Sequence, residues 1–197
     1  MKGLEYLYLD HAARTPMRES AFDAFKHAEE VAFANSSGGH ELSRRAKNLL
    51  EESRDFIADV FGAAPKEITF TSGGTEADNW IIKSPFLNNA PTSSKLVTSQ
   101  IEHEAVLGSA EWIQAKGFSV NFVGVNEDGV VDVEKFIESC NKETLVASLM
   151  YANNETGVVQ PINEILKKIK DINSEILFHS DVVQAVASEK LDFHKLV

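Results

Sequence analysis

The sequence lacks the features that mark several large classes of protein. It contains one cysteine, Cys140, which excludes an intrachain disulfide framework and fits a reducing cytoplasm. It has no apolar run long enough to span a membrane, and its first residues lack the apolar core of a signal peptide. The 19 basic and 30 acidic residues give a net charge of −11, so no broad basic face is available to nucleic acid or an anionic membrane. We therefore expect a cytoplasmic protein that binds neither of these, and we assign no metal site.

The remaining composition is that of a globular domain. A chain of 197 residues suffices for one domain with a substantial core, and 43% hydrophobic with 25% charged residues is ordinary for such a domain. No low-complexity tract, linker-like stretch or internal repeat interrupts the sequence.

Strand-like and helix-like segments alternate along the chain. Thr15 is expected to cap the first helix, and Gly62 and Pro65 are expected to end the second. The alternation predicts an α/β fold, a three-layer sandwich around a mostly parallel sheet, in which ligands bind outside the carboxyl ends of the strands. We expect strands at residues 6–9, 68–71, 96–99, 120–125, 145–150 and 176–179, and helices at residues 17–33, 42–61, 76–84, 105–116, 133–140 and 162–172.

A glycine-rich turn lies between the strand expected at residues 68–71 and the helix expected at residues 76–84. Gly73 and Gly74 let backbone N–H groups approach an anion closely, and the helix N-terminus adds its partial positive charge. Thr75 can add a hydroxyl donor. Read alone, these residues fit a phosphate cradle and a ligand-free turn equally well.

Chemically competent side chains follow three of the later expected strands. His103 follows the third strand, Asn153 the fifth, and Asp181 and Gln184 the sixth. Taken singly, His103 fits a helix start, Asn153 a turn and Asp181 a helix cap or turn. Because the carboxyl ends of parallel strands meet at one edge of a sheet, the joint pattern indicates a functional site there.

Five segments carry a resemblance to a known family. They are Leu9 to Pro16, Thr71 to Asn79, Glu102 to Val106, Asn153 to Gly157 and His179 to Gln184. In this order, from about residue 6 to the end of the chain, these segments resemble the class V aminotransferase family, and within it the NifS/IscS-type cysteine desulfurases. The resemblance implies an incomplete large domain of the pyridoxal 5′-phosphate (PLP) fold-type I, with residues 1–15 as an N-terminal arm, residues 16–197 as part of the large domain, and the C-terminal small domain absent.

The family binds PLP, and the resemblance implies a role for each matching residue. A carboxylate beside the ring nitrogen keeps that nitrogen protonated, which deepens the electron sink of the ring. An imidazole can lie over the ring face and titrates near neutrality. The implied roles are phosphate binding by Gly73, Gly74 and Thr75, ring stacking and proton transfer by His103, pairing with the ring nitrogen by Asp181, and contact with the 3-oxygen or the substrate carboxylate region by Asn153 and Gln184.

Two covalent groups of the family have no match in the sequence. The family's Schiff-base lysine lies in a Ser-x-His-Lys motif, but no serine stands two residues before His194, so we do not expect Lys195 to be that lysine. Cys140 lies on an expected helix and is expected to be a structural or surface thiol rather than the persulfide carrier. Two positions of the substrate-side loop depart from the family pattern. Arg14 stands where the family usually has a threonine, and Ser36 stands where proline is common.

The resemblance implies a cysteine desulfurase, which converts L-cysteine to L-alanine and keeps the sulfur as an enzyme persulfide for iron–sulfur cluster or thio-cofactor assembly. We expect this chain alone to be inactive, as half of a split enzyme, a truncated product or a non-catalytic module. The expected partners are a complementary C-terminal half or a homodimer partner, and a sulfur acceptor protein. Two other functions stay open, namely another class V aminotransferase or lyase acting on a different amino acid, and a catalytically dead partner-binding half-domain.

Overall fold

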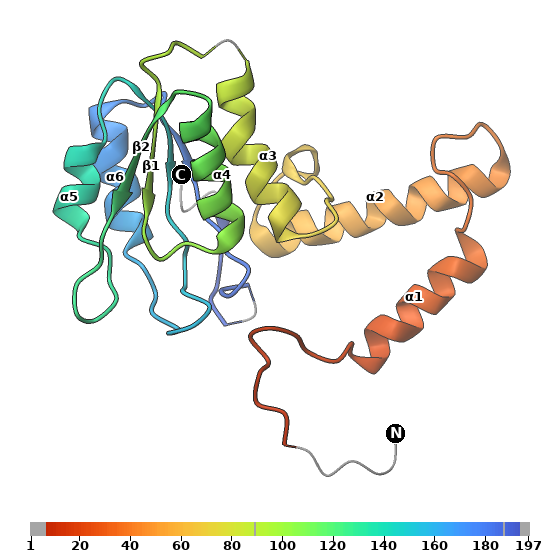
Figure 1. Ribbon diagram of the computed structural model, residues 1–197. Helices are drawn as coiled ribbons and strands as arrows, with labels where there is room; N and C mark the ends of the chain where they lie inside the picture. Colours follow the sequence, from red (N-terminus) through yellow and green to blue (C-terminus); the bar gives the residue numbers. More distant parts are fainter. Residues whose placement is uncertain (1–6, 89, 187, 194–197) are drawn as a thin grey trace. The chain divides into compact units, whose positions relative to one another are not determined.

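The computed structural model describes residues 7–88, 90–186 and 188–193, which are coloured in Figure 1. The chain divides into two compact units. Of the described residues, 7–69 with 192–193 form the helical unit, and 70–88, 90–186 and 188–191 form the sheet unit. All the predicted cofactor-binding residues fall in the sheet unit.

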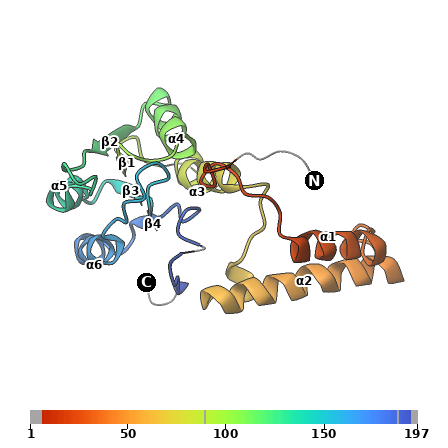
Figure 2. The ribbon, with the colours of Figure 1, turned by 90° about the horizontal axis from the view of Figure 1, so that it is seen from below.

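The helical unit contains two long α-helices that lie side by side, as Figure 2 shows. The second helix is capped by His40, whose Nδ1 accepts a hydrogen bond from the Ser43 backbone N–H at 3.3 Å. It ends at Gly62, whose φ of +63° is the left-handed conformation that glycine adopts most easily, so the expected helix end is confirmed. The elements of this unit are α1 (Glu19–Val31), α2 (Glu41–Phe61) and the 3-10 turn η1 (Pro65–Glu67).

The start of α1 differs from the prediction. The helix begins at Glu19, and Arg18 occupies the N-cap position without a side-chain hydrogen bond, so the prediction that Thr15 caps it is wrong. The backbone carbonyl of Arg18 accepts the first helical bonds, from the N–H groups of Ala21 and Phe22 at 3.0 Å each. Helix ends depend on which carbonyl begins this ladder, and residue spacing fixes that point only to within a few residues.

Two expected strands do not form in the described residues. Residues 7–9 carry no strand, and neither do residues 68–71. The Ile68 backbone is extended, but its carbonyl accepts a hydrogen bond from Arg54 Nη1 at 2.6 Å instead of joining a ladder. A strand requires a neighbour that pairs with its backbone groups, and local β propensity cannot supply one.

The apolar face of α2 is largely exposed. Phe56 is 70% exposed and Val60 is 56% exposed, although both belong to the helical spacing of apolar residues in this segment. The buried residues of α2 are Ser43, Ala46 and Ala58, which are small. The helix therefore forms as expected while its large apolar side chains remain accessible.

The sheet unit is built on four strands in the order β2-β1-β3-β4, and all three pairings are parallel. The mostly parallel sheet that the sequence predicts is therefore confirmed. The strand β3 is buried along its length except for a half-buried Leu145, as its continuous apolar run indicates. The strands are β1 (Lys95–Ser99), β2 (Ser119–Val123), β3 (Thr144–Ser148) and β4 (Leu177–His179).

Helices cover both faces of this sheet, which makes the predicted three-layer sandwich (Figures 1 and 2). The helices α3 and α4 pack on one face, where Leu96 and Val146 meet Ile82 of α3 and Val106 of α4. The helices α5 and α6 pack on the other face. The four helices are α3 (Gly74–Leu87), α4 (Glu104–Ala115), α5 (Val133–Ser139) and α6 (Ile162–Ile172).

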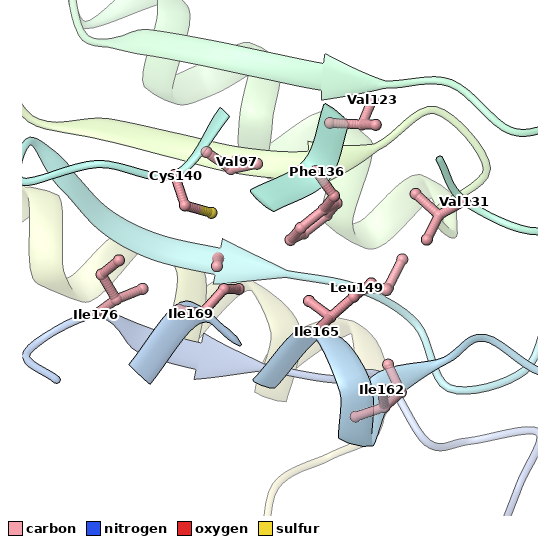
Figure 3. Close-up of a cluster of buried hydrophobic side chains, with 11 residues drawn as sticks. Val97, Val123, Val131, Phe136, Cys140, Leu149, Ile162, Ile165, Ile169 and Ile176 are labelled. Atoms are coloured by element: carbon pink, nitrogen blue, oxygen red, sulfur yellow. The ribbon is translucent and has the colours of Figure 1, made fainter. Parts of the chain in front are cut away.

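The core under α5 and α6 is shown in Figure 3. Phe136 of α5 and Ile165 of α6 are completely buried there, against Val97 from β1. Successive residues of a strand point to opposite faces, so Val97 enters this core while its neighbour Leu96 enters the other. The two cores fix the sheet between its helices and hold the strand ends in place.

Candidate functional site

The predicted site residues lie on loops at the carboxyl edge of the sheet. The loop after β1 is joined to the loop after β3 by a hydrogen bond of 3.0 Å from Asn153 Nδ2 to the Ile101 carbonyl oxygen. The loop after β3 is joined in turn to the loop after β4, because the Tyr151 backbone N–H donates to the Asp181 carbonyl oxygen at 2.9 Å. These three loops therefore form one connected rim.

A cavity of about 380 Å³ opens between the loops after β1 and β3. His103 and Asn153 both line it, together with Glu102 and with Val125 and Gly129 from the segment after β2. The structure thus brings two predicted residues, 50 positions apart in the sequence, to one concave surface. The other predicted residues do not line this cavity.

His103 occupies the N-cap position of α4. Its Nδ1 accepts a hydrogen bond from the Ala105 backbone N–H at 3.1 Å, and the residue is exposed. A ring nitrogen that accepts carries no proton, so the neutral imidazole has its proton on Nε2. The helix-start role and a ligand role are compatible, because the cap uses Nδ1 and leaves Nε2 available.

Asn153 is buried, and its amide shapes the loop after β3. Its Oδ1 accepts from the backbone N–H groups of Glu155 at 3.0 Å and Thr156 at 2.9 Å. Besides Ile101, its Nδ2 meets Met150 Sδ at 3.4 Å, a weak acceptor. A ligand oxygen could replace only that weak contact without opening the loop.

Asp181 follows β4 and is half-buried. Its Oδ1 accepts the Val183 backbone N–H at 2.9 Å, the turn role that the residue type alone suggests. Gln184 is half-buried in the turn at residues 183–186 that follows. Both predicted residues are therefore on one loop, next to the loop of Asn153.

The glycine-rich turn precedes α3, and Gly74 is the first residue of that helix. The first N–H groups of any α-helix have no acceptor within the helix, so those of α3 are available to an anion. A Cβ on Gly74 would lie 3.0 Å from Val183 Cγ2, so this turn lies in close contact with the Asp181 loop, and a side chain here would have to displace Val183. Exposed Thr75 adds its hydroxyl at the same point. The turn therefore fits a phosphate, and it lies beside the loop that carries Asp181.

Glu102 has a role that the sequence did not indicate. Its position beside Glu104 suggests a first-turn helix charge, but α4 begins at Glu104 and Glu102 is only 5% exposed. Its Oε1 accepts from Ser99 Oγ at 2.7 Å and from the Met150 backbone N–H at 2.9 Å, while Oε2 is buried without a described partner. Burial raises the pKa of Glu102 to about 7, against the opposing effect of these two hydrogen bonds.

The sequence matches a known protein family over nearly its whole length. The family described as Aminotransferase class-V matches residues 7–197. The chain belongs to the aminotransferase class V family. The resemblance inferred from the five sequence segments is therefore confirmed.

Named proteins and solved structures that are similar to this chain support its membership of the class V family. "Cysteine desulfurase IscS" from Methanosarcina thermophila is 37% identical over 190 residues, which are 96% of this chain and 46% of that protein. A solved structure named "NIFS-LIKE PROTEIN" matches with a TM-score of 0.92 at 32% identity and covers 95% of this chain and 51% of that one. "SspA in complex with cysteine" matches with a TM-score of 0.91 at 31% identity, covering 96% and 54%. This chain spans about half the length of these relatives.

None of the helices in residues 7–88, 90–186 and 188–193 combines the length and the apolar character needed to cross a membrane. Within the same ranges, no three His, Cys, Asp or Glu side chains are grouped as metal ligands would be. Lys195 lies outside the described residues.

The environment of Cys140 does not suit a persulfide carrier. Its side chain is part of the core under α5 and α6 (Figure 3), and burial raises the pKa of its thiol from 9.0 to about 11. The thiolate is the reactive form, and its fraction at pH 8 falls about 100-fold with this shift. We expect iodoacetamide to alkylate Cys140 at pH 8 at least about 100-fold more slowly in the native chain than in urea. Equal rates in the two states would show that the thiol is accessible and ionised.

Proposed function

We propose that this chain provides the PLP-binding part of a cysteine desulfurase, which takes sulfur from L-cysteine and leaves L-alanine. The observation that supports this most is that His103, Asn153 and Asp181 lie on joined loops at one edge of the sheet of a class V fold, and that Gly74, the first residue of α3, lies against the Asp181 loop. The relatives named cysteine desulfurase, and the neighbour named as a complex with cysteine, favour this reaction over another class V aminotransferase or lyase.

We assign each residue toward PLP by its chemistry. The first N–H groups of α3 and the Thr75 hydroxyl bind the phosphate. Asp181 holds a proton on the pyridine nitrogen, and Gln184 contributes an amide from the same loop. PLP, when bound, supplies an electron sink for the α-carbon of the amino acid.

His103 and Asn153 form the substrate side of the proposed site. Because the His103 cap occupies Nδ1, its Nε2 is the atom that gives or takes a proton. Asn153 keeps the loop after β3 in place and presents one amide hydrogen, now on Met150 Sδ, toward a ligand oxygen. The loops that carry them keep a cavity of about 380 Å³ open to an amino acid.

We do not assign the covalent steps to this sequence. Cys140 is buried with a thiol pKa of about 11, and Lys195 lacks the serine of the family motif. We propose that both covalent groups come from a further polypeptide segment or a partner chain, and that the assembled protein is a cytoplasmic homodimer. Sulfur then passes to an acceptor protein for iron–sulfur cluster or thio-cofactor assembly.

Treatment with PLP and borohydride tests this assignment. We expect reversible, non-covalent PLP binding, because the phosphate turn and Asp181 are present without the family's lysine motif. Equilibrium dialysis measures the binding, and borohydride reduction followed by peptide mass spectrometry measures any pyridoxyl-lysine. We expect no single lysine to be labelled preferentially.

The control is a second aspartate on the opposite side of the sheet unit. Asp181→Ala is expected to weaken PLP binding, whereas Asp171→Ala, at an exposed position of α6, is expected to leave it unchanged. Preferential labelling of Lys195 would contradict the assignment of the covalent group. A wild-type chain that binds no PLP would favour the partner-binding half-domain instead.

A further inference from the structure

A row of polar side chains lies under the carboxyl edge of the sheet, on the face covered by α3 and α4. Thr98 of β1 pairs with Ser148 of β3, and Ser148 pairs with His179 of β4. Directly paired residues of neighbouring strands point to the same face. Two positions earlier, Leu96 and Val146 pack against α3 and α4, so the polar row faces the same helices.

His179 in this row uses both of its ring nitrogens. Its Nδ1 lies 2.9 Å from Ser148 Oγ, and its Nε2 lies 3.3 Å from Asp78 Oδ1. The side chains of His179 and Asp78 are only 10% and 6% exposed. An ionised carboxylate only accepts, so Nε2 donates to Asp78, and in the neutral ring Nδ1 accepts from Ser148. Both contacts together fix the orientation of the ring.

A serine, a histidine and an aspartate are also the residues of a hydrolase catalytic triad, but Ser148, His179 and Asp78 do not have its geometry. Ser148 is completely buried and cannot reach a substrate. The serine is on Nδ1 and the aspartate on Nε2, the reverse of the arrangement in which Nε2 takes the serine proton. The set therefore holds elements together and does not act as a nucleophile.

The two ends of this bridge belong to two parts of the proposed cofactor site. Asp78 lies one turn after Gly74, the start of the phosphate turn, and His179 lies two residues before Asp181. The approach of Gly74 to Val183 is a second contact between the same two parts. We propose that His179 is a positioning residue that, through Asp78 and Ser148, fixes the phosphate turn of α3 against the loop that carries Asp181. This inference rests on the proposed PLP site.

Two amide variants separate the two contacts of the ring. The amide of asparagine falls near the position of Nδ1 and that of glutamine near Nε2, so His179→Asn keeps the Ser148 side and His179→Gln keeps the Asp78 side. We expect His179→Asn to weaken PLP binding about tenfold in equilibrium dialysis, and His179→Gln to restore most of that loss. Ile165→Ala, in the core under α6, is the control for general destabilisation and is expected to leave PLP affinity unchanged.

A second measurement needs no cofactor. In ¹H–¹⁵N spectra of the ligand-free full chain, His179→Asn is expected to shift the amide signals of Gly74 and Thr75, and Ile165→Ala is not. If His179→Asn does not fold, Asp78→Asn weakens the same contact at equal volume and replaces it. Unshifted amides and unchanged affinity in a folded variant would overturn the inference. If the wild-type chain binds no PLP, the proposed function fails, and the ligand-free spectra still decide whether His179 positions the turn.

Discussion

The Glu102→Gln variant is expected to be more stable than the wild-type chain by about 3 kcal/mol at pH 8 and equally stable at pH 4. Burial raises the pKa of Glu102 from 4.5 to about 7, so the folded chain binds this proton more tightly than the unfolded chain. The stability contributed by the protonated group is complete below pH 4.5 and is lost as the pH rises through about 7. Glutamine is neutral throughout and keeps an oxygen that accepts from Ser99 and Met150.

Urea unfolding of both chains at pH 4, 6 and 8 measures this difference. At each pH the comparison uses the difference in free energy of unfolding between the two proteins. The contributions of the titrating groups that both proteins share cancel in this difference. Glu104→Gln is the matched control, because Glu104 is exposed in the first turn of α4. A Glu102→Gln difference that stays constant from pH 4 to pH 8 would mean that Glu102 has the same pKa in the folded and the unfolded chain, and would contradict the raised pKa.

The Phe136→Ala variant is expected to lose about 3–5 kcal/mol of unfolding free energy. Phe136 is completely buried between α5 and the sheet, and its removal leaves a cavity lined by Val97, Ile165 and other core side chains. Chemical denaturation at neutral pH measures the loss. Because this core supports β1 and β3 from the face opposite the polar row, the loss is expected to appear as one cooperative transition of the sheet unit.

Phe56→Ala is the control for this substitution. The same atoms are removed from a side chain that is 70% exposed on α2, and we expect a change within about 0.5 kcal/mol. A cost at Phe56 as large as that at Phe136 would show that the apolar face of α2 is covered in solution, for example by a second copy of the chain.

The sequence predicted the sheet unit well because its elements follow local rules. The helix expected at residues 162–172 is α6 without any change of bounds, since Ile162, Ile165 and Ile169 recur at helical spacing. The alternation of strands and helices predicted parallel pairing, and parallel pairing places His103, Asn153 and Asp181 on loops at one edge. Those predictions needed no knowledge of which side chains touch.

The features that the sequence did not predict depend on contacts between distant residues. The segment at 68–71 has strand-like residues, but no described strand pairs with it. The environment of Glu102 is set by Met150, 48 residues away, and that of His179 by Ser148, 31 residues away. Register and burial create these environments, so residue type and spacing alone suggested a helix charge for Glu102 and gave no role to His179 beyond its place in a motif.

The hydrogen bonds at the carboxyl edge of the sheet also indicate the stage of folding at which the proposed cofactor site first forms. Glu102 meets Met150 across 48 residues, Asn153 meets Ile101 across 52, and Ser148 meets His179 across 31. Contacts of such high sequence separation form late, after the loops between them have closed. A chain that has made its helices but has not yet paired β3 with β4 therefore lacks the proposed site, and a ligand of that site would stabilise only the fully assembled sheet.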